Sequence, residues 1–266
     1  MITKADLRRW SGWLALVVVF SIACAWLSNW QFSRREEALA AIAQVAKNYD
    51  AQPVSIDDLA KLNSFNVQNQ WRPAKMVGHY LVGNTVLVRN RPLDGQPGFL
   101  ELIPFQLTDG RLIAIERGWI ASDSNYNPPK SFPLPCAEQQ TVVARVRPAE
   151  PTLGRSAPVG QLGTINIEEL VKSQGIKDRI FTSIYARVAT EQISANENPK
   201  PLAKPELDEG NHLSYALQWI MFALMAVAAL IWGVRKEREA KSSRQSTARK
   251  RKTIGQADAE IEDSLT

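Results

Sequence analysis

The most constraining feature of this chain of 266 residues is an uninterrupted apolar stretch in its C-terminal part. The stretch Asn211–Val234 holds no charged side chain over 24 positions. An α-helix rises about 1.5 Å per residue, so the stretch is long enough to cross a hydrocarbon core of about 30 Å. A basic run begins directly after it at Arg235, and such runs flank membrane helices on the cytoplasmic side. The sequence therefore predicts a transmembrane helix over residues 212–234 that ends in the cytoplasm.

A second segment without charge, Trp10–Ser33, lies near the N-terminus. Basic residues precede it, and tryptophans stand near both of its ends, as in the aromatic belts of membrane helices. A cleaved signal peptide is the competing interpretation, because Ser21–Cys24 resembles a weak lipoprotein cleavage site. The apolar run continues well past Cys24 to Trp30, which favours an uncleaved transmembrane helix over residues 10–33.

The charge of the chain is distributed unevenly. The net charge is +5, yet residues 31–211 hold 20 basic and 20 acidic side chains, so the whole excess lies in the two end segments. A nucleic-acid-binding protein would need a basic patch within its folded domain, so nucleic acid is not an expected partner. Basic ends beside two spans predict a multi-pass protein of the lipid bilayer. Residues 1–9 and 235–266 would be cytoplasmic, and the polar C-terminal tail is predicted to be disordered.

The middle of the chain, residues 34–211, is predicted to be one extracytoplasmic domain rich in β-structure. Short runs of Val, Ile and Leu alternate with turn dipeptides such as Asp109-Gly110, which is typical of antiparallel sheets. The expected strands are 73–80, 85–91, 99–107, 112–120, 141–147 and 181–189, and the expected helices are 34–48, a short one after Ser55, and 167–174. The predicted fold is thus a membrane protein in which two transmembrane α-helices flank a mainly antiparallel β (α+β) domain, sandwich or barrel-like.

The sequence offers few groups that could carry catalysis. The chain has two histidines, His79 and His212, and two cysteines, Cys24 and Cys136. It contains no HExxH, CxxC or P-loop motif and no glycine-rich GxGxxG turn after a predicted strand. We therefore expect a protein that is not an enzyme.

Polar and aromatic side chains gather where the two predicted spans would meet the outer membrane surface. These candidate cofactor-binding residues are Trp30, Gln31 and Arg34 in the first segment and His212, Tyr215 and Trp219 in the second. Neutral imidazole is an axial ligand of haem iron, aromatic faces pack against the macrocycle, and arginine pairs with propionates. His212 is thus the candidate metal ligand. The alternative is that His212 only anchors its helix at the lipid headgroups.

Five sequence blocks occur in an order that is typical of one protein family. The blocks are Leu27–Gln31 with Arg34, Arg72-Pro73 with Gly78–Tyr80, Asn90–Pro92 with Asp94-Gly95, Gly98-Phe99 and Pro104, Glu116–Ile120, and Asn211–Trp219. Together with the two spans, they resemble the Surfeit locus protein 1 family of cytochrome c oxidase assembly factors. The resemblance runs from about residue 27 to 232 and is weakest over residues 149–205. Ser28 stands where the family often has glycine, which predicts a looser approach of the two helices.

The resemblance implies a factor that assists the assembly of an aa3-type cytochrome c oxidase. It implies that the protein handles haem a transiently on its way to subunit I, with His212 at the position of a histidine that some members associate with haem a. The implied partners are the oxidase subunits, especially subunit I, and the enzymes of haem a synthesis. A permanent accessory subunit without a cofactor of its own is the alternative. The short basic N-terminus favours a bacterial plasma membrane over a mitochondrion.

Overall fold

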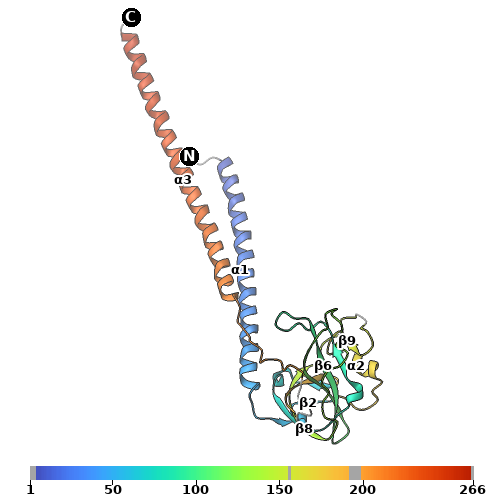
Figure 1. Ribbon diagram of the computed structural model, residues 1–266. Helices are drawn as coiled ribbons and strands as arrows, with labels where there is room; N and C mark the ends of the chain where they lie inside the picture. The colour runs from blue at the N-terminus through green and yellow to red at the C-terminus, as the bar shows by residue number, and fades with distance from the viewer. Residues whose placement is uncertain (1–3, 155–156, 192–198, 265–266) are drawn as a thin grey trace. The chain divides into compact units, whose positions relative to one another are not determined.

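The computed structural model describes residues 4–154, 157–191 and 199–264 and divides the chain into two compact units (Figure 1). One unit combines Met1–Leu39 with Asp208–Thr266, and the other is Ala40–Leu207. The first unit contains most of the two long helices of the chain, and the second contains its strands.

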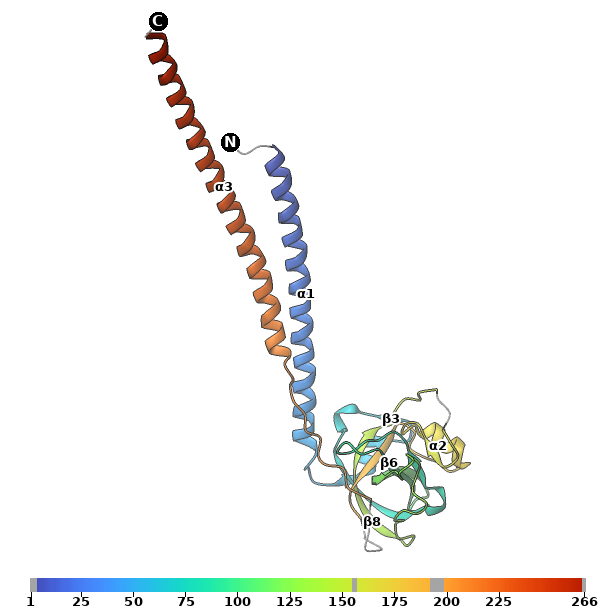
Figure 2. The ribbon, with the colours of Figure 1, turned by 45° about the horizontal axis from the view of Figure 1, so that its top comes forward.

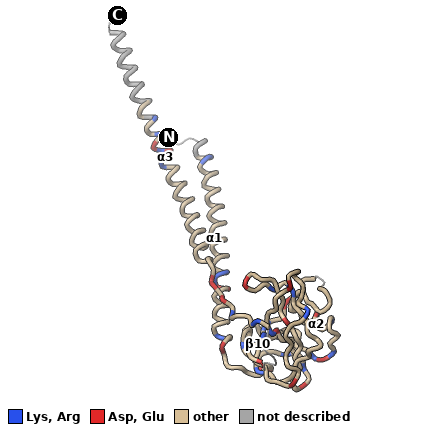
Figure 3. The backbone as a smooth tube through the Cα atoms, viewed as in Figure 1, with Lys and Arg blue, Asp and Glu red and all other residues tan. Residues whose placement is uncertain are grey.

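The first unit is built from helix α1, Lys4–Asn48, and helix α3, His212–Ser264, which lie side by side in Figures 1 and 2. Both have the length and composition to cross a membrane, over Leu7–Asn48 and His212–Arg244. Figure 3 shows their apolar stretches as long segments without charge. The structure thus confirms both predicted helices, and it joins the predicted helix 34–48 to the first of them without a break.

The C-terminal tail differs from its prediction. Residues 235–264 continue α3 as a helix, whereas their polarity predicted disorder. The tail is rich in Lys, Arg, Glu and Ala and holds no proline, and these residue types lose little side-chain freedom in a helix.

The second unit is a β-rich domain that contains one short helix. Its strands are β1 Val54–Ser55, β2 Ala60–Lys61, β3 Ser64–Phe65, β4 Pro73–Tyr80, β5 Val86–Val88, β6 Gly98–Leu107, β7 Leu112–Ala121, β8 Gln140–Pro148, β9 Gln161–Leu162 and β10 Ile184–Thr190. Its helices are α2, Ile167–Gln174, and the single 3₁₀ turns η1 Ile56–Asp58, η2 Val67–Asn69 and η3 Val82–Asn84. The six strands predicted from sequence and α2 are present, and the helix expected after Ser55 is the turn η1.

The main sheet closes on itself, so the domain is barrel-like (Figure 2). Strand β4 pairs with both β8 and β6, and the remaining pairings β8–β10, β10–β7 and β7–β6 complete a ring. Most pairings are antiparallel, as expected, but β10–β7, β1–β4 and β5–β9 are parallel. A closed ring leaves no edge among these five strands, which protects them from pairing with other chains.

The core lies on both sides of the longest hairpin, β6–β7. One cluster surrounds Phe105 and Ile115 inside the ring, and another packs β6 and β7 against α2 through Leu170. Almost every residue of these two strands is buried, because helix and ring cover opposite faces. Helix α2 is held at both ends: Asn166 caps its first turn, accepting from the Glu169 amide at 2.9 Å, and Gly175 ends it in the left-handed conformation.

Gly78 illustrates why some glycines are required in this sheet. A Cβ atom at Gly78 would lie 1.9 Å from the carbonyl oxygen of Gln106 on the paired strand β6. The structure places this glycine inside β4, where two backbones approach closely. A bulge does occur beside Gly118, where the β6–β7 register skips one residue.

Candidate functional site

One face of α1 packs against α3 through small and polar side chains. Cys24, Ser28, Gln31 and Arg35 recur at intervals of four, three and four residues, so they share one face of the helix. Cys24 and Ser28 are buried, and so is the facing Ala216 of α3. Small residues allow helix backbones to approach closely, and the hydrophobic effect does not drive such packing in lipid.

Three polar contacts follow this face, one at each successive turn. Ser28 Oγ donates to the carbonyl oxygen of Ala216 at 3.1 Å. Gln31 Oε1 lies 2.8 Å from His212 Nδ1. The guanidinium of Arg35 forms an ion pair with Glu209 at 3.0 Å. Ser28 therefore fits the helix contact and bonds across it.

The Gln31 contact fixes the chemistry of His212. An amide oxygen has no proton to give, so Nδ1 is the donor in this arrangement, and in the neutral ring Nε2 then carries the lone pair. Gly210 lies two residues before His212, and a Cβ atom there would lie 3.4 Å from Nε2, so a side chain at this position would crowd that edge of the ring. A histidine whose Nδ1–H is held by an acceptor and whose Nε2 is free is oriented as a metal ligand. These residues fit a haem group held through one imidazole.

The other predicted site residues are arranged in two further groups. Trp30 is exposed, and the Arg34 guanidinium lies over its ring at 5.9 Å while pairing with Glu37. Tyr215 is half exposed, and Trp219 makes an edge contact with Phe222, with ring centroids 5.7 Å apart. Of the six candidates, the structure brings Gln31 and His212 into direct contact. The described residues hold no cluster of three His, Cys, Asp or Glu side chains that could chelate a metal.

Sequence reasoning missed the ion pair between Arg35 and Glu209 as part of this site. The signal was present in the spacing of Cys24, Ser28, Gln31 and Arg35, which marks one helix face when read as a repeat. The predicted site residues were chosen by side-chain type and by their depth along the predicted spans. Neither property distinguishes one face of a helix from another.

The β-domain contains a separate buried charge cluster around Arg117. This side chain forms ion pairs with Glu101 at 2.7 Å and Glu191 at 2.9 Å, and Tyr80 Oη donates to Glu191 at 2.6 Å. Burial raises the pKa of Glu101 to about 7, against the opposing effect of Arg117. Burial likewise raises the pKa of Tyr80, so its phenol stays protonated and donates. Arg117 thus pairs with acids of its own domain, and all these contacts are internal to the fold.

Comparison with known proteins adds independent information. The model of the SURF1 family matches residues 18–224. An uncharacterised SURF1-like protein of Mycobacterium bovis is 28% identical over 229 residues, which cover 82% of each chain. A SURF1-like protein of Rickettsia felis is 23% identical over 228 residues, which cover 82% of this chain and 94% of that one. The cytochrome oxidase assembly protein SHY1 of Saccharomyces cerevisiae is 25% identical over 183 residues, which cover 65% of this chain and 46% of that one.

The matched region begins within α1, includes the whole β-domain and ends within α3. It contains the five sequence blocks and the two helices that carry the Gln31–His212 contact. The resemblance inferred from those blocks is thereby confirmed, and the chain belongs to the SURF1 family.

Proposed function

We propose that this protein is an assembly factor for an aa3-type cytochrome c oxidase and that it holds haem a on the way to subunit I. The observation that carries the proposal is the contact between Gln31 and His212, which leaves one imidazole nitrogen free for iron. The yeast relative SHY1 is a cytochrome oxidase assembly protein, which supports the assembly role over a permanent accessory subunit. The partners are then the oxidase subunits and the enzymes that make haem a.

The proposed topology follows from charge. Both basic ends lie in the cytoplasm, the two helices cross a bacterial plasma membrane, and the β-domain lies outside. Gln31 and His212 then stand at the outer membrane surface. A haem group that enters or leaves laterally through the bilayer can reach that level without crossing the polar surface.

Each residue of the helix pair has a separate task in this proposal. Gln31 orients the His212 ring and keeps the proton on Nδ1. The Arg35–Glu209 ion pair and the Ser28 bond hold α1 and α3 in the register that this contact needs. Tyr215 and Trp219 offer aromatic surface on α3, and Arg34, whose pair with Glu37 is exposed and weak, is available to a propionate. The haem would supply an iron centre, and the neutral imidazole of His212 would hold it.

The test is an absorption spectrum of the full chain purified after co-expression with haem a synthesis enzymes. We expect a haem a band in the wild type and its loss in His212→Ala. His79→Ala is the matched control, because it removes the other histidine of the chain, which lies on β4. Gln31→Leu should retain haem but lower its occupancy, since the ring loses its acceptor. Equal haem content in wild type and His212→Ala would exclude this residue as the ligand.

A second measurement separates the assembly role from that of a permanent subunit. A transient factor should be found with assembly intermediates and be absent from mature oxidase. Stoichiometric co-purification with the active enzyme would favour the accessory subunit. If the protein assists assembly without carrying haem, the His212→Ala variant should still restore oxidase activity in cells that lack the wild-type protein.

A further inference from the structure

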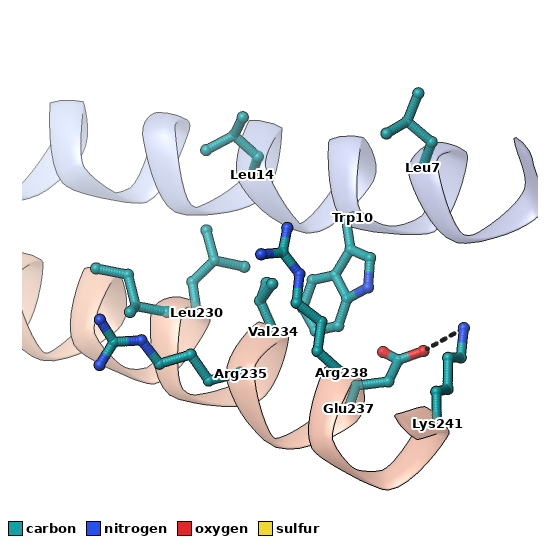
Figure 4. Close-up of a pocket in the computed structure, with 10 residues that line it drawn as sticks. Leu7, Trp10, Leu14, Leu230, Val234, Arg235, Glu237, Arg238 and Lys241 are labelled. Atoms are coloured by element: carbon teal, nitrogen blue, oxygen red, sulfur yellow. Dashed lines mark ion pairs between the residues drawn. The ribbon is translucent and has the colours of Figure 1, made fainter. Parts of the chain in front are cut away.

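A groove runs between α1 and α3 at the end of the helix pair away from His212 (Figure 4). It encloses about 420 Å³, a size typical of small-ligand sites. Trp10 reaches from α1 toward α3, while Leu230 and Val234 point back toward α1. The ring of Trp10 lies 3.6 Å from the place of a Cβ at Gly233, so the helices are close at this point and open on either side.

The groove continues along the helices toward their middle. An adjoining space of about 480 Å³ shares Trp10 and Leu230 with the first and is lined by apolar side chains such as Val17 and Phe20. The two spaces form an elongated apolar slot open to the surroundings of the helix pair. This shape and lining suit a hydrocarbon chain.

The mouth of the groove is strongly basic. Arg235, Arg238 and Lys241 line it at intervals of three residues on α3. Glu237 is the acidic residue of the lining, and it is already paired with Arg9 and with Lys241. Within the described part of the chain, Arg235 and Arg238 form no ion pair with a carboxylate. The rim thus presents two exposed guanidinium groups beside an apolar slot.

These features lie at the level of lipid headgroups if the helices cross a membrane. The charge-free stretch of α3 ends at Val234, and Trp10 marks the corresponding level on α1, where tryptophans prefer the interface. Guanidinium groups bind phosphate through paired hydrogen bonds, and basic pockets between transmembrane helices on the cytoplasmic side suit anionic headgroups. A third apolar helix would fill the slot but would leave the two arginines without a counter-charge.

We propose that this groove binds one anionic phospholipid, with an acyl chain against Trp10 and Leu230 and the phosphate on Arg235 and Arg238. The lipid would act as a wedge that sets the separation of α1 and α3 at their cytoplasmic ends. The separation of the two helices would then depend on how much anionic lipid the membrane contains. This inference depends on the membrane placement of the helices and is independent of haem binding.

Lipid retention by the full chain tests the proposal. The protein is reconstituted in bilayer discs containing phosphatidylcholine and phosphatidylglycerol in equal amounts, then released from the discs and analysed by native mass spectrometry. We expect one phosphatidylglycerol retained per chain in preference to phosphatidylcholine. Arg235→Gln/Arg238→Gln should weaken this retention about 25-fold, because each lost cationic contact weakens binding about fivefold.

Two further variants test whether the lipid binds in the groove and not to the positive charge of α3 in general. Lys236→Gln/Arg244→Gln removes the same charge from α3 at positions outside the groove lining and should retain the lipid as the wild type does. Leu230→Trp fills the slot without changing charge and should expel the lipid. Inorganic phosphate should not compete, because the acyl chain supplies much of the affinity. Equal retention of both lipids, equal loss in both charge variants, or a co-purifying helical protein in the slot would overturn the proposal.

Discussion

Replacing Arg117 by methionine tests whether the buried charge cluster of the β-domain is held together electrostatically. Arg117 is 3% exposed and bridges Glu101, which is fully buried, and Glu191. Methionine fills similar space but leaves both carboxylates without their cation. Breaking a buried pair by removing one partner costs about 3–5 kcal/mol of folding free energy, because the carboxylate left in the interior either stays uncompensated or must take up a proton.

The loss should depend on pH in a defined direction. In the wild type the folded-state pKa of Glu101 is about 7, above its ordinary value of 4.5, so the folded protein holds a proton that the unfolded chain has released. The contribution of Glu101 to stability therefore falls as pH rises from 4.5 to about 7, and then levels off. Without Arg117 the pKa of Glu101 rises further, so the variant continues to lose about 1.4 kcal/mol per pH unit above 7. Between about pH 6 and 8.5 the difference between wild type and variant should grow by about 2 kcal/mol.

Urea unfolding of the full chain in mild detergent measures both quantities. Of the eight tryptophans, Trp71 and Trp119 lie in the β-domain, and the other six lie in the detergent-bound helices and give a constant background. The control is Glu101→Gln/Arg117→Met, which removes the buried carboxylate together with its cation and should recover most of the loss at high pH. A loss that is the same at about pH 6 and 8.5 would show that Arg117 matters through packing and would refute the electrostatic reasoning.

Three further predictions concern single residues of the fold. Gly78→Ala should destabilise the barrel by about 3 kcal/mol or more, since strands β4 and β6 must part, whereas Gly83→Ala, with open space around it, should be tolerated in the same urea assay. Ser28→Leu should force α1 and α3 apart and increase maleimide labelling of buried Cys24 in a background without the second cysteine, while Ser28→Ala should leave labelling low; unchanged labelling in both would contradict the close contact. Asn166→Ala should cost about 1 kcal/mol by uncapping α2, and a cost near zero would mean that packing alone holds this helix.

Local signals determined which elements of the fold could be predicted. Strand β4 and helix α2 have the predicted bounds. Alternation of apolar and polar residues marks the strand in the sequence, and an asparagine and a glycine mark the two ends of the helix. The parallel pairing of β10 with β7 had no local signal, since it joins segments about 70 residues apart. Two-residue strands such as β9 carry too few side chains for a pattern. Barrel closure through the pairing of β4 with β6 also depends on residues far apart in the chain. The sequence therefore could not distinguish a sandwich from a barrel.

The candidate site shows a different limit of sequence reasoning. Charge-free stretches and their flanks placed Gln31 and His212 at one level although 181 positions separate them. The same reasoning could not choose Gln31 over Trp30, because neighbouring residues on a helix point about 100° apart. That choice depends on which face of α1 meets α3, and small side chains decide it, since only Cys24 and Ser28 let the backbones approach the facing Ala216 closely. In a site built between two helices, the small residues of the contact therefore determine which helix face carries the site. The chemistry of the polar residues identifies the helical turn but not the face.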